Sequence, residues 1–242
     1  MRTRFPIIGV LGGMGPLATV DFMAKVIQRT PAQQDQDHPP MIVHSLGETP
    51  PRTEAILDGG PSPEPDLVDG VRFLSDAGAA FIAIPCNTAH YWYEPMQAAT
   101  DVPILHIADA ALELAASGGA ALKKVGVLST SGTMASGIYR QRIEARGIET
   151  LEPDEATQTA LVTGGIAHVK AGDVPAAQGL LAQAAERLLD AGAEAVILGC
   201  TEIPVALNAD HPLAPQLTDA TDALAAATVE RALAGEDKTA VA

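Results

Sequence analysis

The chain alternates short, continuous apolar runs with longer segments in which apolar residues recur at helical spacing. Short apolar runs are typical of strands buried on both faces of a parallel sheet, and amphipathic segments are typical of the helices that cover it. The fold class is therefore expected to be α/β. The pattern predicts strands at 7–11, 41–45, 80–85, 102–105, 125–128, 148–151 and 195–198. It predicts helices at 17–29, 52–57, 66–77, 88–99, 108–117, 138–145, 155–170, 174–190 and 219–233, with a candidate break at 163–165.

Two of the apolar runs end in nearly the same way, and they carry the only two cysteines of the chain. Cys86 and Cys200 each follow a Leu-x-Asp-Ala-Gly-Ala segment whose leucine lies 12 positions earlier. Each segment predicts a helix that ends at a glycine cap, then a buried strand, then a cysteine at the carboxyl end of that strand. Because ligands bind outside the carboxyl ends of strands in open α/β sheets, the two cysteines are expected to face one shared pocket.

The spacing of glycine and cysteine also repeats between the two halves of the chain. From Gly9 to Cys86 is 77 residues, and from Gly126 to Cys200 is 74. This near-equal spacing predicts duplicated α/β lobes with a cleft between them. The last helix is expected to cross back onto the first lobe, and the tail is expected to fray. The predicted lobes are 1–115 plus 219–242 and 116–218, with the frayed tail at 237–242.

Composition and charge narrow the classes of partner. The hydrophobic fraction of 47% and the charged fraction of 19% are those of a globular protein. No apolar run approaches the roughly 20 residues that span a bilayer, and the N-terminal segment does not resemble a signal peptide, so a cytoplasmic location is expected. A net charge of −15 repels nucleic acid and anionic membranes, so neither is an expected partner. An anionic substrate would need local cations in its pocket.

Two stretches of the first half could supply contacts to such a substrate. Gly12-Gly13-Met14-Gly15-Pro16 follows the first strand and could hold an anion at the start of the next helix, although a purely structural turn is an equal alternative. The stretch fits neither a Walker A loop nor a dinucleotide-binding fingerprint. The irregular segment 48–65 is typical of a binding loop, and Arg52 is its candidate cation, with a surface arginine as the alternative.

The paired cysteines allow several kinds of chemistry. A single buried cysteine is usually inert, a structural disulfide is not expected in the cytosol, and the histidines lack metal-ligand spacing, so no metal is expected. Equivalent positions in two lobes favour paired acid–base thiols, one removing a proton and the other delivering one. Inversion of a carbon centre by such a pair needs hydrogen-bond donors that stabilise the developing charge. The donors at hand are Asn87, Thr88, Thr130, Thr133 and Thr201.

Four motifs carry a resemblance to a known family. They are Gly12-Gly13-Met14-Gly15-Pro16, Arg52-Thr53, Pro85-Cys86-Asn87-Thr88-Ala89-His90 and Gly199-Cys200-Thr201-Glu202-Ile203-Pro204. With these motifs the chain, from about residue 7 to about residue 230, resembles the aspartate/glutamate racemase superfamily. It is most similar to the cofactor-independent aspartate racemases.

The resemblance implies two Rossmann-like lobes related by pseudo-twofold symmetry, with the active site in the cleft. It implies racemisation of an acidic amino acid without pyridoxal phosphate or another cofactor, by a homodimer, with Cys86 and Cys200 as the two catalytic bases. Arg52 and Lys170 match the cations that bind the substrate's side-chain carboxylate in this branch. The full set of substrate-binding residues that the resemblance implies is Met14, Arg52, Asn87, Thr88, Thr130, Thr133, Lys170, Thr201 and Glu202.

Departures from the family pattern leave alternatives open. Glutamate racemases usually carry Asp-Ser where this chain has Gly12-Gly13, and histidine where it has Glu202, which weakens a glutamate assignment. Pro50-Pro51 stands where many relatives place an aspartate beside the arginine. A broad-specificity racemase, a maleate isomerase or a hydantoin racemase would also keep both cysteines. The second class of function is a two-lobed small-molecule binding protein without catalysis.

Overall fold

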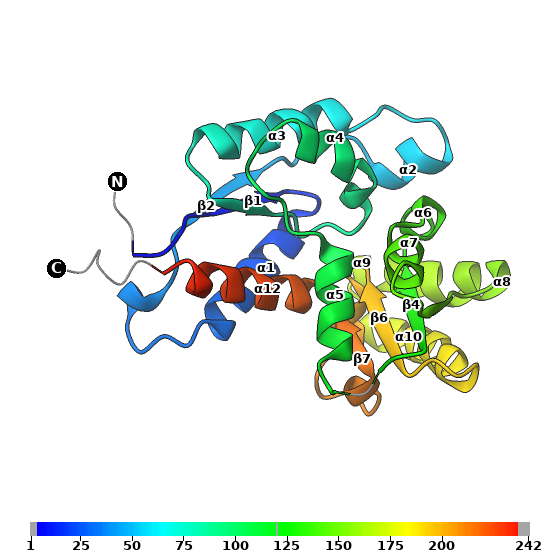
Figure 1. Ribbon diagram of the computed structural model, residues 1–242. Helices are drawn as coiled ribbons and strands as arrows, with labels where there is room; N and C mark the ends of the chain where they lie inside the picture. Colours follow the sequence, from blue (N-terminus) through cyan, green and yellow to red (C-terminus); the bar gives the residue numbers. More distant parts are fainter. Residues whose placement is uncertain (1–3, 120, 237–242) are drawn as a thin grey trace.

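Two parallel sheets lie in separate halves of the molecule (Figure 1). The computed structural model describes residues 4–119 and 121–236. The strands are β1 (Ile8–Gly12), β2 (Met41–Ser45), β3 (Phe81–Ala83), β4 (Lys124–Ser129), β5 (Glu149–Leu151), β6 (Ala195–Gly199) and β7 (Leu217–Asp219). The α-helices are α1 (Pro16–Arg29), α2 (Arg52–Leu57), α3 (Glu64–Asp76), α4 (Tyr93–Ala98), α5 (Ile107–Ala116), α6 (Ser131–Ser136), α7 (Ile138–Glu144), α8 (Glu155–Thr157), α9 (Gly164–Lys170), α10 (Val174–Asp190), α11 (Ile203–Ala206) and α12 (Ala220–Ala234). The remaining helical turns are η1 (Asp35–Asp37), η2 (Thr88–Trp92), η3 (Gln158–Thr163) and η4 (Ala214–Gln216).

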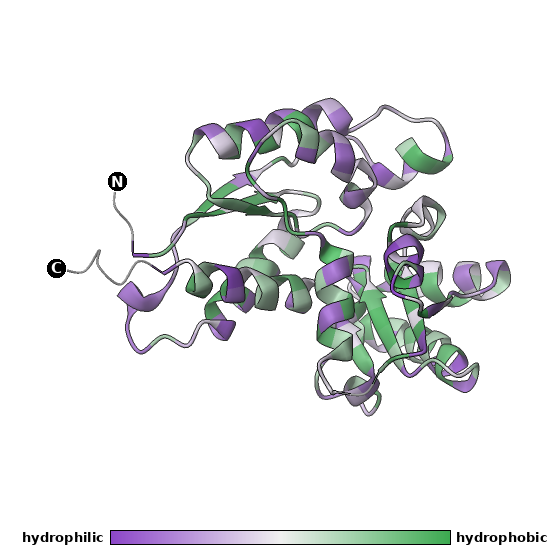
Figure 2. Ribbon diagram, in the orientation of Figure 1, coloured by the Kyte–Doolittle hydropathy of each residue, from purple (hydrophilic) through white to green (hydrophobic). Residues whose placement is uncertain are grey.

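The strand order is β2-β1-β3 in the first sheet and β5-β4-β6-β7 in the second, and all paired strands are parallel. Every residue of β1, β3 and β6 is buried, as expected for strands covered by helices on both faces. Figure 2 shows apolar residues concentrated on the strands, most clearly on β6. The predicted α/β class and two-lobed arrangement are confirmed. The lobe boundaries at 115/116 and 218/219 stay a prediction, and the tail at 237–242 lies outside the described residues.

The repeated approach to the two cysteines is built in the same way in both lobes. Gly78 and Gly192 have φ values of +92° and +98°, which a glycine adopts without strain. The amide that follows each glycine donates back to the first leucine of its motif, Ala79 to Leu74 and Ala193 to Leu188, each at 3.0 Å. This is the Schellman pattern of helix termination. The predicted sequence of glycine-capped helix, buried strand and cysteine is therefore present twice.

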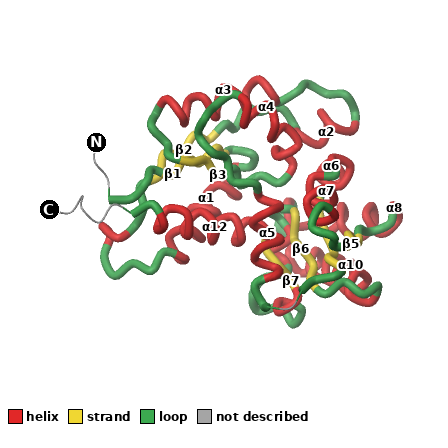
Figure 3. Tube along the Cα trace, viewed as in Figure 1, coloured by secondary structure: helices red, strands yellow, loops and turns green. Residues whose placement is uncertain are grey.

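One hydrophobic core joins the two lobes. It contains side chains from β1 and β3 of the first sheet, from β4 and β6 of the second, and from α1, α5, α7 and α12. Helix α12 packs against both α1 and α5, as expected of a C-terminal helix that crosses back onto the first lobe. Figure 3 shows α5 and α12 between the two groups of strands. Each lobe also has a smaller core of its own on the other face of its sheet.

Three expected elements differ from the structure. Residues 102–105 make only an isolated bridge between Ile104 and Ile82, because Pro103 has no backbone N–H with which to extend the ladder. Residues 217–219 form strand β7, where the pattern predicted no strand, and the sequence does not reveal their pairing with β6. The candidate break at 163–165 is absent, since the helix continues through a π-helical turn, η3. Gly165 allows close packing there, because a Cβ would stand 2.6 Å from Leu181 Cγ.

Candidate active site

Both cysteines line one cavity of about 500 Å³. Its walls come from the segments that follow β1, β3, β4 and β6, so carboxyl ends of strands from both sheets converge on it. Every site residue predicted from the sequence lines this cavity except Thr133. The structure thus brings the predicted residues together, while their roles in binding and catalysis stay predictions.

The backbone around Cys86 is fixed by His90. The Cys86 side chain is 6% exposed, and His90 Nδ1 lies 2.9 Å from the Cys86 carbonyl oxygen. The other ring nitrogen of His90 accepts a hydrogen bond from the Ile107 amide at the start of α5. With Nε2 accepting, Nδ1 is the donor to Cys86. Burial lowers the pKa of His90, so the ring is neutral and holds the two backbone segments by hydrogen bonds rather than by charge.

The charge of Arg52 acts directly on Cys86. Burial raises the pKa of the Cys86 thiol, and the Arg52 guanidinium and the Ala89 amide oppose that rise. Arg52 Nη1 donates to the Thr49 and Pro50 carbonyls at 3.2 and 3.0 Å, and Nη2 donates to the Met14 carbonyl at 3.2 Å. These bonds hold the guanidinium against the glycine-rich loop at the cavity wall.

The environment of Cys200 is of the opposite sign. Its side chain is 5% exposed, and its Sγ donates to Glu202 Oε2 at 3.0 Å. The Thr201 hydroxyl donates to the same oxygen, also at 3.0 Å. Burial and the Glu202 carboxylate together raise the pKa of Cys200 well above its ordinary value, while Lys170 lowers it to a smaller extent. Cys86 therefore faces a cation, whereas Cys200 faces an anion.

A chain of hydroxyl groups closes the cavity between the lobes. Thr88 Oγ1 lies 2.7 Å from Thr133 Oγ1 and 3.4 Å from Thr130 Oγ1, and Thr130 donates to Thr133 at 2.9 Å. The Thr130 side chain also caps α6 by accepting from the Thr133 amide. Thr133 is only 1% exposed and does not line the cavity, so it supports the other two from behind.

Asn87 presents an unused donor. Its side chain is 4% exposed, and its Oδ1 accepts a hydrogen bond from the Tyr139 hydroxyl. Its Nδ2 is buried and has no hydrogen-bond partner among the described residues. A buried donor without a partner carries a desolvation cost, so this amide is suited to an acceptor brought by a ligand.

Lys170 and Glu202 lie at the mouth of the cavity. Lys170 Nζ is 4.0 Å from Glu202 Oε1, and the Lys170 side chain is 64% exposed. An exposed pair at this distance contributes little to stability, so Lys170 is free to turn toward a bound anion. Five wall residues were not among the site residues predicted from the sequence: Gly15, Pro51, Thr53, Glu54 and Gly199. Each is next to or near a predicted site residue in the sequence, and this was the signal that could have identified them.

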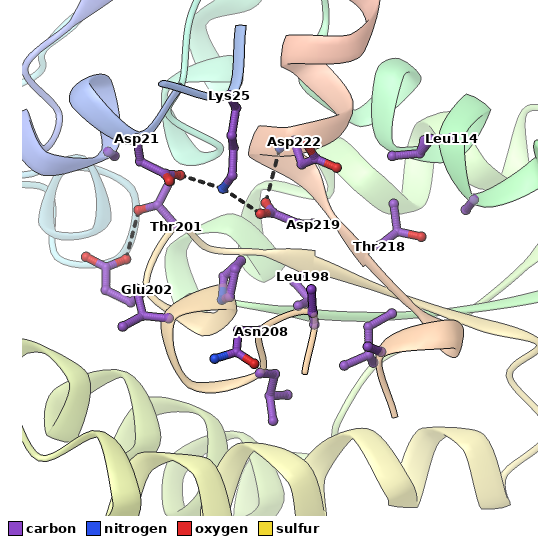
Figure 4. A pocket seen from close by; sticks show the side chains of 18 of the residues that line it. Asp21, Lys25, Leu114, Leu198, Thr201, Glu202, Asn208, Thr218, Asp219 and Asp222 are labelled. Atoms are coloured by element: carbon purple, nitrogen blue, oxygen red, sulfur yellow. Dashed lines mark hydrogen bonds and ion pairs between the residues drawn. The ribbon is translucent and has the colours of Figure 1, made fainter. Parts of the chain in front are cut away.

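A larger cavity of about 1240 Å³ adjoins this one and shares Gly15, Lys170, Thr201 and Glu202 with it. Neither cysteine lines it. Figure 4 shows Lys25 between Asp21 and Asp219, and these charged side chains of the lining are paired with one another: Lys25 Nζ lies 2.5 Å from Asp21 and 2.6 Å from Asp219. These charges are satisfied within the protein, so the smaller cavity is the candidate active site.

Across residues 4–119 and 121–236, no group of three or more histidine, cysteine, aspartate and glutamate side chains is arranged to hold a metal ion. Of the helices in the described part of the chain, none has both the length and the apolar composition needed to cross a membrane.

The fold and the site define a class: a two-lobed α/β protein with a thiol from each lobe at one shared cavity. Residues 11–228 match the family described as Asp/Glu/hydantoin racemase. Over 232 residues the chain is 32% identical to a broad-specificity amino-acid racemase, RacX, of Bacillus subtilis, and the match covers 94% of this chain and 99% of that protein. The protein belongs to the Asp/Glu/hydantoin racemase family, and its resemblance to that family in sequence is confirmed.

Solved structures agree with this assignment. The aspartate racemase of Picrophilus torridus is similar with a TM-score of 0.78 at 32% identity, over 97% of both chains. An aspartate racemase homologue from Pyrococcus horikoshii gives a TM-score of 0.76 at 25% identity, over 96% of this chain and 100% of that one. A glutamate racemase from Francisella tularensis, at 19% identity and a TM-score of 0.63, covers 92% of this chain and 78% of its own, and shares the fold. Membership of this family supports the assignment of the protein as an amino-acid racemase.

Proposed function

We propose that the protein is a cofactor-independent aspartate racemase in which Cys86 and Cys200 transfer protons at Cα. One observation carries this proposal: two buried thiols, at matching positions of the two lobes, line the same cavity. A substrate held there meets one thiol from each lobe. Removal of a proton by one and delivery of a proton by the other converts one enantiomer into the other.

The charges beside the two thiols support a different resting role for each, one as the base and the other as the acid. Burial raises the pKa of Cys86, and the charge of Arg52 opposes that rise. The pKa of Cys200, by contrast, is raised by both burial and Glu202. Cys86 therefore loses its proton first and is the resting base, and Cys200 stays a thiol and is the resting acid. Cys86 takes the Cα proton, and Cys200 gives its own proton to the same carbon. The cycle leaves Cys86 as thiol and Cys200 as thiolate, ready for the reverse reaction.

The cavity also carries the groups that the carboxylates of aspartate require. The unpaired Nδ2 of Asn87 and the Thr88 hydroxyl are donors for the α-carboxylate, which gains charge as the proton leaves. Arg52 and Lys170 supply positive charge for the side-chain carboxylate. They offset, within the cavity, the field of a chain whose net charge is −15.

The test is incubation of the purified protein with L-aspartate in D2O, without pyridoxal phosphate or metal. NMR follows loss of the Cα proton, and chiral chromatography follows D-aspartate. We expect solvent deuterium in both enantiomers from the wild type, and a loss of at least about 100-fold in racemisation from Cys86→Ala and from Cys200→Ala. Racemisation that survives either substitution would rule out the two-base mechanism.

A second candidate is a racemase of broad specificity. A cavity of about 500 Å³ is within the range of about 300–1,000 Å³ that holds drug-sized ligands, so it can accept side chains larger than that of aspartate. Similarity to the broad-specificity enzyme of Bacillus subtilis also supports it. A panel of L-amino acids in the same D2O assay separates the two. A preference for aspartate over alanine, lysine and methionine of more than about tenfold in kcat/KM supports the first candidate, and equal values support the second.

A further inference from the structure

Tyr139 connects the two cysteine segments from inside the protein. It lies on α7 of the second lobe and is 2% exposed, among the largest fully buried side chains. Its hydroxyl donates to Oδ1 of Asn87, 52 positions away in the first lobe, at 2.5 Å. Asn87 directly follows Cys86 in the sequence. The sequence alone did not draw attention to this tyrosine, because it stands inside an ordinary amphipathic helix.

The ring of Tyr139 is held in place by the residue before the other cysteine. A Cβ at Gly199 would stand 2.9 Å from Tyr139 Cε2 and 3.3 Å from Cζ, so only glycine leaves room for the ring. The Ser129 Cβ lies against the same face of Gly199, where a Cβ would meet it at 3.2 Å. The ring is therefore confined beside Gly199, and its hydroxyl reaches a fixed point at Asn87.

The hydrogen bond decides which end of the Asn87 amide faces the cavity. The Tyr139 hydroxyl donates to Asn87 Oδ1, and burial raises the pKa of Tyr139 well above its ordinary value, so the hydroxyl keeps the proton that this bond needs. With the amide oxygen held by this donor, the nitrogen lies on the other side. That nitrogen is buried without a partner among the described residues, and Asn87 lines the cavity beside Cys86.

We propose that Tyr139 is a positioning residue that holds the Asn87 amide with its nitrogen toward the substrate's carboxylate. This inference rests on the proposed function. Without the hydroxyl, the amide can rotate by about 180° and turn its oxygen, instead of its nitrogen, to an anion. The carboxylate is then held less well in the bound substrate, and less well still as it gains charge during proton removal, while the thiols that move the proton are unchanged.

The first experiment compares kinetics of Tyr139→Phe and of a matched control, Tyr93→Phe. Tyr93 also donates its hydroxyl to an oxygen, the Ile104 carbonyl at 3.2 Å, but Ile104 does not line the cavity, whereas Asn87 does. We expect Tyr139→Phe to lower kcat/KM for aspartate by at least about tenfold, with a lower kcat as well as a higher KM, because the carboxylate that Asn87 holds gains charge as the proton leaves. Tyr93→Phe should change neither kcat nor KM by more than about twofold. An unchanged kcat/KM in Tyr139→Phe would overturn the proposal.

A double-mutant cycle separates positioning from a general loss of structure. In an Asn87→Ala background, Tyr139→Phe should have little further effect on kcat/KM, because the amide that it orients is gone. An equal fall in kcat/KM in both backgrounds would mean that Tyr139 acts on the fold rather than on Asn87, and would overturn the proposal.

A spectroscopic measurement keeps the inference testable if aspartate is not the substrate. The side-chain amide signals of Asn87 in 15N-labelled protein are assigned by their loss in Asn87→Ala. We expect Tyr139→Phe, and not Tyr93→Phe, to shift these signals and to allow them to broaden through amide rotation. Unchanged Asn87 signals would refute the role of Tyr139. Absence of aspartate turnover by the wild type would instead refute the proposed substrate.

Discussion

Replacement of Glu202 by glutamine changes the charge beside one thiol and little else. Glu202→Gln removes a negative charge whose oxygen lies 3.0 Å from Cys200 Sγ, and it keeps a side-chain oxygen that can accept the thiol proton. Glutamine has nearly the same volume as glutamate, so the packing of the cavity wall is preserved. The substitution therefore tests whether Glu202 holds Cys200 in its thiol form.

The size of the effect follows from the distance. Two unit charges 3.0 Å apart repel by about 1.4 kcal/mol when screened as in water, and by about 5.5 kcal/mol at an effective dielectric constant of ~20. The side chain of Glu202 is 28% exposed, so the screening lies between these limits. The smaller figure alone corresponds to about a tenfold change in the deprotonation equilibrium of Cys200.

The direction is fixed by which thiol controls each limb of the pH profile. Activity requires a Cys86 thiolate and a Cys200 thiol, so the acid limb reports Cys86 and the alkaline limb reports Cys200. Loss of the Glu202 charge lowers the pKa of Cys200, and the alkaline limb moves to lower pH. Glu202 is a lesser contributor to the raised pKa of Cys86, so the acid limb moves less in the same direction and the active range narrows.

The assay is kcat/KM for racemisation of the confirmed substrate between pH 5 and pH 11, with Glu54→Gln as the matched control. Glu54 is another carboxylate of the same cavity wall, but it is not among the groups that set the pKa of Cys200. The control should keep the wild-type alkaline limb. An alkaline limb that stays in place in Glu202→Gln, or that moves to higher pH, would refute the assignment of Cys200 as the resting acid.

Two further predictions address the other wall of the cavity. Arg52→Ala removes the positive charge that opposes the effect of burial on Cys86, so the pKa of Cys86 rises and the acid limb of the pH profile moves to higher pH. The same substitution removes a cation proposed to bind the side-chain carboxylate, so KM for aspartate rises by at least about tenfold. An acid limb at its wild-type position would contradict the role of Arg52. Gly13→Ala places a side chain at a residue whose φ is +90°, and its Cβ would stand 2.4 Å from the Leu46 amide nitrogen. We expect the free energy of unfolding to fall by at least about 1–2 kcal/mol, and calorimetry to show a Tm lower by about 2–4 °C per kcal/mol. Gly47→Ala is its control, since a Cβ there meets nothing within 4 Å, and equal Tm values for the two variants would show that the strain is absent.

The sequence predicted the site better than it predicted the smaller elements of the fold. Cys86, Cys200 and their neighbours could be identified because strand, turn and cysteine repeat at nearly equal spacing in the two halves. The same local rules place Arg52 at the start of a short helix, which begins at that residue. Elements that are determined by repeated motifs or by strong local patterns can be predicted correctly from the sequence, because they do not depend on contacts with distant segments.

Features that depend on contacts across the fold were not predictable in this way. Strand β7 is three residues of ordinary polarity that become a strand only because β6 offers an open edge. Thr133 is placed behind Thr88 by the packing of α6, outside the residues that line the cavity, a position that its residue type could not reveal; its role in substrate binding stays a prediction. Tyr139 gains its importance from Asn87 in the other lobe, a partner that no local pattern points to.

The helix that completes the shared core lies far along the chain from the helix that it covers. Arg29 of α1 pairs with Asp222 of α12, 193 positions later, and the inner face of α1 is covered by that helix. At ~5–20 residues per second, a ribosome needs about 10–40 s to supply this partner. During that time the nascent first lobe carries an uncovered apolar face, so the order of the elements along the chain delays completion of the shared core until α12 has been made.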